Sequence, residues 1–135
     1  MRTEIQIKIR GYHIDHFGHV NNGRYFNFFE EGRWNYFDDK QELIDYFHEN
    51  YLAHVVSKII IQYKKPLFIS DTITIETDVL ESKGSGFTMF QTLYKKDKDA
   101  IAATAKVNNV FVNAMNGNTA PMPEELVELW PDLGR

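Results

Sequence analysis

The segments Gly11–Asn22 (GYHIDHFGHVNN) and Gly23–Phe37 (GRYFNFFEEGRWNYF) follow each other and determine how the rest of the chain must fold. The first is polar and rich in His and Asn, which predicts an ordered loop. In the second, aromatic residues recur every three or four positions, which predicts a helix with a wide apolar face. Asn21 or Asn22 is suited to cap its start. Gly32 costs about 1 kcal/mol inside a helix and therefore indicates a close backbone contact.

The rest of the chain predicts five strands and two short helices from its alternation, β-branched residues and turn signals. The expected strands are Glu4–Arg10, His54–Tyr63, Thr72–Val79, Phe87–Tyr94 and Ile101–Val112, and the expected short helices are Gln41–Asn50 and Pro123–Trp130. The last four strands follow one another closely, so we expect an antiparallel meander covered on one face by the long helix. This is a single α+β domain over residues 1–135. Its exposed sheet face and edges favour self-association.

Composition excludes several classes of protein. The chain has 135 residues, a net charge of −4 and no cysteine, which argues against nucleic-acid binding, disulfides, thiolate zinc sites and a cysteine nucleophile. Its apolar runs are too short for a membrane helix, and its first residues carry charges where a signal peptide would be apolar. We therefore expect a cytoplasmic protein. Aromatic residues make up 14%, which suggests a bulky core, an apolar pocket or an oligomer interface.

The loop before the long helix carries the candidate chemistry. A helix start presents free N–H groups, and an N–H aimed at a carbonyl oxygen stabilises the oxyanion that forms when the carbonyl is attacked. Asp15, a few residues upstream, could attack directly or deprotonate water. Together they would suffice for ester or thioester hydrolysis. The alternative is that Asp15 and the asparagines only cap the loop and the helix.

Other readings of this region stay open at the level of sequence. His13, His16 and His19 are spaced by three and could hold zinc, although spacing in a loop does not force them together. Glu30 and Glu31 could supply a catalytic carboxylate, or pair with Arg33 or Arg24 on a solvated flank. The chain has no Gly-x-Ser-x-Gly elbow, no phosphate-binding Walker loop and no dinucleotide fingerprint.

Several motifs resemble one family. They are the stretch Ile9–Tyr25, the block Glu30–Trp34 (EEGRW), the segment Tyr63–Leu67 (YKKPL) and the pair Ser70–Asp71. The sequence resembles hotdog-fold thioesterases of the 4-hydroxybenzoyl-CoA thioesterase-like superfamily, and among them the small bacterial long-chain acyl-CoA thioesterases. The resemblance covers about residues 3 to 125.

This resemblance implies a hotdog fold, a five-stranded antiparallel sheet wrapped around one long helix. It also implies that two chains pair edge to edge into a homodimer, which can double into a homotetramer, with active sites at the interface. The family's catalytic aspartate falls on Asp15, and the backbone N–H that polarises the thioester carbonyl falls on Asn22. No metal or cofactor is implied, and neither a membrane nor a nucleic acid is an expected partner.

The implied reaction is hydrolysis of an acyl-CoA, with a medium to long chain, to a free fatty acid and CoA. Asp15 would act as general base on water, or as nucleophile through a mixed anhydride. The acyl chain is expected along the aromatic face of the helix. The substrate-binding residues expected from this are Val20, Tyr25 and Phe29 for the acyl part and Lys64 and Lys65 for the phosphates of CoA.

The sequence departs from the family at two positions. His13 stands where many relatives carry the first residue of Asp-x-Asp. Phe17 replaces the asparagine of the Asp-x-Asn-x-His motif of plant acyl-carrier-protein thioesterases, whose other two residues match Asp15 and His19. His19 then either orients Asp15 or water, or only makes structural hydrogen bonds. An acyl-carrier-protein thioesterase and a non-catalytic acyl-CoA or acyl-carrier-protein binding module remain the alternatives.

Overall fold

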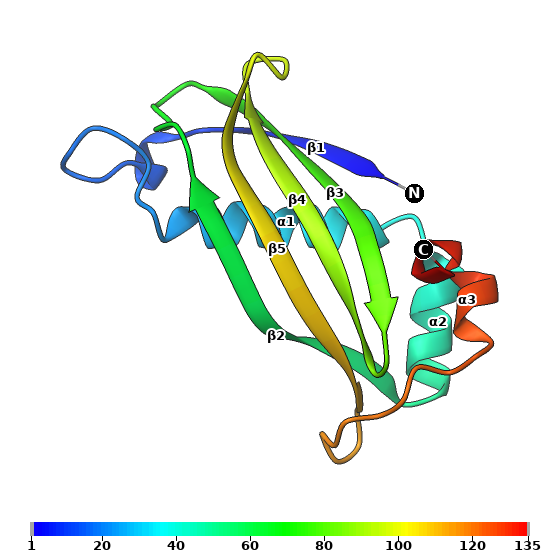
Figure 1. Cartoon of the computed structure of the whole chain (residues 1–135). Coiled ribbons are helices and arrows are strands. Elements are labelled where there is room, and N and C mark those ends of the chain that lie inside the picture. Colours follow the sequence, from blue (N-terminus) through cyan, green and yellow to red (C-terminus); the bar gives the residue numbers. More distant parts are fainter. Residues whose placement is uncertain (1, 135) are drawn as a thin grey trace.

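The computed structural model describes residues 2–134 as one curved sheet with a long helix across one of its faces (Figure 1). The strands are β1 (Thr3–Lys8), β2 (Leu52–Tyr63), β3 (Thr72–Lys83), β4 (Gly86–Lys95) and β5 (Ala100–Asn113). The helices are α1 (Arg24–Phe37), α2 (Gln41–Glu49) and α3 (Leu126–Leu129), with 3-10 turns η1 (Gly11–His13) and η2 (Pro131–Gly134). Within residues 2–134, no helix has the length and apolar character needed to cross a membrane.

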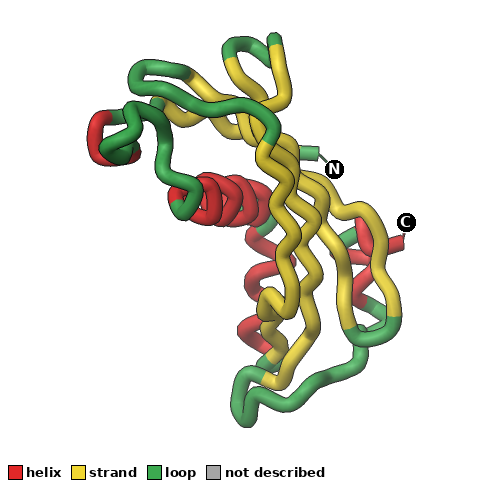
Figure 2. The backbone as a smooth tube through the Cα atoms, turned by 60° about the vertical axis from the view of Figure 1, so that its left-hand side comes forward, coloured by secondary structure: helices red, strands yellow, loops and turns green. Residues whose placement is uncertain are grey.

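The predicted elements are all present, with one shortened. The helix expected over Pro123–Trp130 is only the four-residue α3 followed by η2, and residues 123–125 form a turn before it in which the Leu126 N–H donates to the Pro123 carbonyl oxygen (3.1 Å). The expected five-stranded antiparallel sheet around one long helix is confirmed. Figure 2 shows the strands bending around α1, with the loop before it extending past the start of the helix.

The strand order corrects one expectation. The sheet runs β1-β3-β4-β5-β2, so β3, β4 and β5 form a meander but β2 does not join it as the neighbour of β3. Instead β2 pairs with β5, with Leu52 opposite Asn113 and Tyr63 opposite Ala103. The segment 64–71 is too long for a tight turn, and it crosses the end of the sheet from β5 to the end of β1. This leaves β2 as a twelve-residue edge strand.

Helix α1 packs on the sheet through Gly32. A Cβ atom at this position would lie 2.8 Å from Ile75 Cγ2 and 2.9 Å from Gln91 Nε2, so only glycine allows this approach. Gln91 is completely buried, and its Nε2 donates to the Phe29 carbonyl oxygen (2.8 Å) and to Thr77 Oγ1 (2.9 Å). The close contact that Gly32 indicated is confirmed. It fixes the position of α1 along the strands.

The loop before α1 is held by its own hydrogen bonds and by one buried imidazole. Ile14 and Val20 pair as an antiparallel bridge, and the Val20 N–H donates to the Leu67 carbonyl oxygen (2.8 Å). His13 is buried, its ring contacts that of Phe28 at 5.0 Å, and its Nδ1 accepts the Arg10 N–H at 2.9 Å. An acceptor Nδ1 requires the neutral imidazole. The loop therefore depends on His13 remaining unprotonated.

The first prediction concerns Gly32. Gly32→Ala should lower the free energy of unfolding, because overpacking a close contact costs about 1–3 kcal/mol and exceeds the gain of about 1 kcal/mol that alanine brings to a helix. Urea unfolding of both proteins measures the difference. The exposed neighbour Glu31→Ala is the control and should change stability by less than about 0.5 kcal/mol. A more stable Gly32→Ala protein would contradict the packing described here.

The second prediction concerns His13. Burial, with the positive charges of Arg24 and Arg10, lowers its pKa below the ordinary 6.5. The folded state then binds fewer protons than the unfolded state, so the free energy of unfolding is highest above pH 6.5 and falls as the pH decreases toward the lower, folded pKa. Unfolding measured between neutral and acidic pH should show a flatter slope for His13→Asn, whose side-chain oxygen can still accept the Arg10 N–H.

The exposed His16→Asn variant is the control for this series, because its side chain is in solvent. Its pH slope should match that of the unmodified chain. Equal slopes for all three proteins would show that His13 does not couple the loop to pH.

Candidate active site

The backbone N–H of Asn22, two residues before α1, is a donor left unused by the described chain. Asn21 Oδ1 accepts the Gly23 N–H (2.8 Å), and the Asn22 carbonyl oxygen accepts the Tyr63 hydroxyl (3.2 Å) and the Tyr25 N–H (3.3 Å). Gly23 is thus the residue that flanks the helix, and Asn21 bonds it from two positions upstream. Within residues 2–134 the Asn22 N–H has no hydrogen-bond acceptor. It is free to bind a ligand oxygen.

A groove of about 240 Å³ opens at this point, here called the helix-start groove. It is lined by His19, Val20, Asn22, Tyr25, Tyr63, Lys64, Lys65 and Pro66. The rings of Tyr25 and Tyr63 meet edge to face at 5.0 Å. Burial, helped by Tyr63, raises the pKa of Tyr25 to about 12, so its hydroxyl keeps its proton at neutral pH. The sequence-predicted residues His19, Val20, Asn22, Tyr25, Lys64 and Lys65 therefore all meet in one groove.

The two lysines give the groove a positive rim. The backbone N–H groups of Lys64 and Lys65 both donate to the Ala102 carbonyl oxygen, at 2.8 and 3.1 Å, where β2 ends against β5. Their side chains are exposed, and within residues 2–134 neither ammonium group pairs with a carboxylate. Such a rim attracts anions such as phosphates.

Asp15 lies on the tip of the loop rather than in a groove. It is half-buried, and its Oδ1 accepts the Phe17 N–H at 2.9 Å. Its backbone N–H donates to the His19 carbonyl oxygen (3.1 Å), so it sits across the turn from a residue that lines the helix-start groove. Gly18, with φ of +87°, closes this turn. Within residues 2–134, Oδ2 of Asp15 has no hydrogen-bond partner.

His19 is half-buried and stacks on Phe17 with ring centroids 6.3 Å apart. Its Nδ1 lies 3.4 Å from the Val20 carbonyl oxygen, a long contact. The ring thus has no firm hydrogen bond to Asp15. This geometry favours a role at the groove wall.

Phe29 was expected to contact substrate, and the structure places it elsewhere. Its side chain is completely buried in the core and lines none of the grooves described here. The reason is the close approach at Gly32, which presses this part of α1 against the sheet. We assign Phe29 to the core.

The alternative metal site on the loop histidines is not assembled. Within residues 2–134 no three His, Cys, Asp or Glu side chains lie together in a way that could hold a metal ion. His13 is turned into the core against Phe28, whereas His16 is exposed beside Phe17. Glu30 and Glu31 are exposed on α1, and neither forms an ion pair within 4.0 Å in the described chain.

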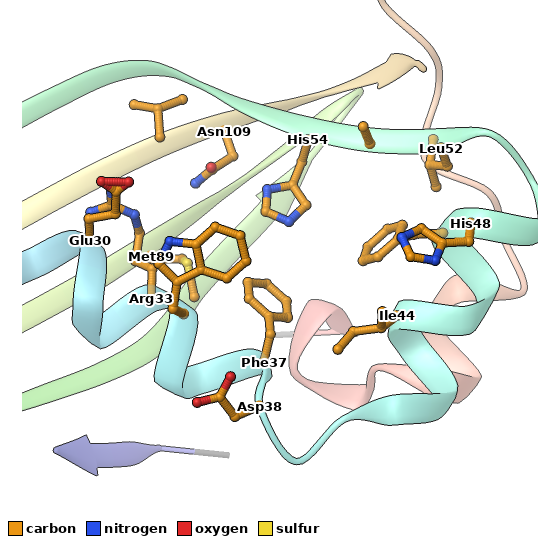
Figure 3. Close-up of a pocket in the computed structure, with 14 residues that line it drawn as sticks. Glu30, Arg33, Phe37, Asp38, Ile44, His48, Leu52, His54, Met89 and Asn109 are labelled. Carbon is orange, nitrogen blue, oxygen red and sulfur yellow. The ribbon is translucent and has the colours of Figure 1, made fainter. Parts of the chain in front are cut away.

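A larger groove, of about 540 Å³, lies between α1, α2 and the first half of β2 (Figure 3). We call it the α1–α2 groove. Its lining includes Arg33, His54 and Asn109, which no sequence motif marks as site residues. Arg33 was considered only as an ion-pair partner, and the other two lie inside predicted strands. Their convergence depends on β2 lying beside β5, which the expected meander did not include.

Comparison with known proteins identifies the family. The profile of the Thioesterase-like superfamily matches residues 9–129. Over 125 residues the chain is 30% identical to the long-chain acyl-CoA thioesterase FadM of Escherichia coli, covering 93% of this chain and 94% of that one. The crystal structure of YbaW, a probable thioesterase from Escherichia coli, superposes with a TM-score of 0.88 at 29% identity and covers 98% of both chains.

A hypothetical protein from Staphylococcus aureus, solved in complex with CoA, shares the fold with a TM-score of 0.78 at 16% identity, over 96% of this chain and 81% of that one. The profile match spans most of the chain, and the resemblance recognised in the loop motif is confirmed. This protein belongs to the thioesterase-like superfamily, with the hotdog fold of its solved relatives.

Proposed function

We propose that this protein hydrolyses acyl-CoA thioesters with medium to long acyl chains to a free fatty acid and CoA. The observation that carries the proposal is the Asn22 N–H before α1, which has no acceptor among residues 2–134 and belongs to a residue that lines a groove with a positive rim. The similarity to FadM, a long-chain acyl-CoA thioesterase, supports this substrate class. The Staphylococcus aureus structure supports CoA as the carrier, because the same fold binds it there.

The thioester carbonyl oxygen would accept the Asn22 N–H. Negative charge develops on this oxygen when the carbonyl carbon is attacked, and a fixed N–H at a helix start stabilises it. The Tyr63 hydroxyl holds the Asn22 carbonyl oxygen, so the donor is fixed before substrate arrives. Val20 and Tyr25 would pack beside the reacting group, and Lys64 and Lys65 would attract the phosphates of CoA.

Asp15 is the carboxylate we assign to the attack. As general base it would take a proton from water, whose oxygen then bonds to the carbonyl carbon as CoA leaves as the thiol. As nucleophile it would form a mixed anhydride that water hydrolyses in a second step. Incorporation of oxygen-18 from labelled water into Asp15 in a single turnover separates the two. His19 would line the groove beside the carbonyl.

We propose that a second copy of the chain completes the site, because the helix-start groove is bordered by Tyr63, the last residue of the exposed edge strand β2. The β2 edge is the surface we propose for pairing. It is twelve residues long, and its exposed apolar side chains include Val55, Val56 and Ile60, each between 45 and 47% exposed. A long apolar edge with unpaired backbone groups pairs readily with another strand. Two copies joined here would form a homodimer, the unit from which a homotetramer could be built.

The third prediction tests the carboxylate. Asp15→Asn keeps the shape of the side chain and its bond to Phe17, but removes the charge needed as base or nucleophile. We expect the rate of thiol release from a long-chain acyl-CoA to fall about 10²–10⁴-fold, with circular dichroism and oligomeric state unchanged.

The exposed Asp97→Asn variant, in the turn between β4 and β5 and outside the grooves described here, is the matched control and should retain the full rate. Thiol release by Asp15→Asn within a few fold of the unmodified chain would remove Asp15 from the reaction.

The fourth prediction tests the edge. In the double variant Val55→Lys and Ile60→Lys, four added positive charges would lie between the two β2 strands of a dimer, and like charges oppose pairing. We expect light scattering to show monomers where the unmodified chain is dimeric or larger, with thiol release reduced at least about tenfold because each site loses its partner. Ile101→Lys, exposed at the start of β5, should leave both measurements unchanged. An active monomer would contradict the proposal.

A further inference from the structure

The walls of the α1–α2 groove are apolar and suited to hydrocarbon. Phe37 of α1, Ile44 and Phe47 of α2, and Leu52 and Val56 of β2 contribute to them. At about 540 Å³ the groove is more than twice the size of the helix-start groove, and it falls within the range of small-ligand pockets. A hydrocarbon chain placed here would be removed from water, which is favourable in proportion to the buried area.

One end of this groove presents a guanidinium group with donors to spare. An arginine has five N–H donors, and Arg33 uses one of its groups on Gln91 Oε1 at 3.1 Å. Within residues 2–134 no carboxylate lies within 4.0 Å of it, and no other hydrogen-bond acceptor is bound. Burial lowers the pKa of Arg33, while the charge of Glu30 opposes this effect. A partly buried cation whose donors are unpaired is costly unless a ligand or water satisfies them.

His54 and Asn109 complete a polar cluster around this end. The His54 ring lies among Phe37 (5.2 Å), Phe47 (5.6 Å) and Phe87 (5.2 Å), and it lines the groove together with Asn109. Burial lowers its pKa, so the ring is neutral at neutral pH and one nitrogen acts as donor. Figure 3 shows Arg33, His54 and Asn109 toward one end of the groove, together with Glu30 and Met89, and Ile44 and Leu52 at the other end.

Within residues 2–134, Gln91 Oε1 is the acceptor that Arg33 hydrogen-bonds, and no second acceptor is bound. Gln91 is completely buried, and both its amide ends are already engaged, by Arg33 on one side and by Phe29 and Thr77 on the other. Glu30 also borders the groove, and its negative charge would repel a ligand with a charge of the same sign. The ligand that fits is therefore an apolar chain with a neutral oxygen that accepts a hydrogen bond.

We propose that the α1–α2 groove binds the acyl group of the thioester substrate, and that Arg33, with His54 and Asn109, selects acyl groups that carry a hydroxyl or an oxo group along the chain. This inference rests on the proposed thioester hydrolysis and specifies its substrate. A site that hydrogen-bonds a substrate oxygen discriminates strongly against the analogue that lacks it, because its own polar groups are then left unpaired.

Strand β2 connects this groove with the reacting end. Its first residues, Leu52 to Val56, border the α1–α2 groove, and its last residue, Tyr63, borders the helix-start groove. In an antiparallel pair of two β2 strands, the end of one strand meets the beginning of the other. The acyl chain of a thioester held at Asn22 of one protomer would then enter the α1–α2 groove of its partner.

The fifth prediction compares dodecanoyl-CoA with its hydroxy and oxo derivatives, substituted at successive carbons from the thioester to the ω end. For at least one derivative we expect kcat/KM to exceed that of dodecanoyl-CoA about tenfold or more, since hydrogen bonds to charged groups are the stronger ones. In Arg33→Met the ratio of the two values should fall at least about tenfold.

Lys106→Met is the matched control, since it removes a cation of similar length from the exposed surface of β5, outside the grooves described here. It should keep the ratio of the unmodified chain. His54→Phe and Asn109→Leu provide the same test if Arg33→Met does not fold, and each should lower the ratio.

Equilibrium binding to the Asp15→Asn protein separates this inference from the proposed reaction. The dissociation constants of dodecanoyl-CoA and of its derivatives should show the same preference without turnover. A chain that hydrolyses dodecanoyl-CoA but has no preference for any derivative, or an Arg33→Met protein that keeps the preference, would overturn the inference and leave the hydrolase intact. A preference in binding without any thiol release would instead refute the proposed hydrolysis.

Discussion

The contact between Gly32 and the sheet sets the position of α1, and with it the position of both grooves. At this point α1 has no side chain, Ile75 and Gln91 occupy the space, and Gln91 bonds the helix backbone at Phe29. The helix can therefore neither slide nor rotate on the strands without losing buried hydrogen bonds. Its start is held beside the end of β2 and its second half beside the beginning of β2. Both grooves follow from this one arrangement.

The local bonds at the start of α1 explain why one donor stays available. Asn21 satisfies the Gly23 N–H, and Tyr63 and Tyr25 both donate to the Asn22 carbonyl oxygen. The neighbours of the Asn22 N–H are thus engaged, while the N–H itself has no acceptor in the described chain and Asn22 lines the helix-start groove. A donor oriented in this way needs no reorganisation when charge develops on a bound oxygen, which is the condition for efficient electrostatic stabilisation.

Local patterns in the sequence predicted the elements well, and long-range pairing poorly. The three- and four-residue spacing of aromatic residues placed the long helix within one residue of its observed start, and alternation located all five strands. The position of β2 could not be predicted in this way, because a strand's neighbours depend on the path of segment 64–71 across the sheet. Phe29 was misplaced for a related reason: the depth of a helical side chain depends on how closely Gly32 lets the helix approach.

Local patterns also do not mark Arg33 as a site residue, because its place in a groove depends on the position of β2. The Asn22 N–H, and the N–H groups of Arg33 other than the one bonded to Gln91, have no acceptor in the described chain. An unpaired donor that is buried away from water lowers the free energy of unfolding by about 1–3 kcal/mol. This cost is avoided when the donor lies at a groove that water can enter. Water that enters the grooves would satisfy these donors in the free protein. A substrate with a hydroxyl or oxo group would replace this water at Asn22 with its thioester carbonyl and at Arg33 with its second oxygen. An unsubstituted acyl chain would replace it only at Asn22.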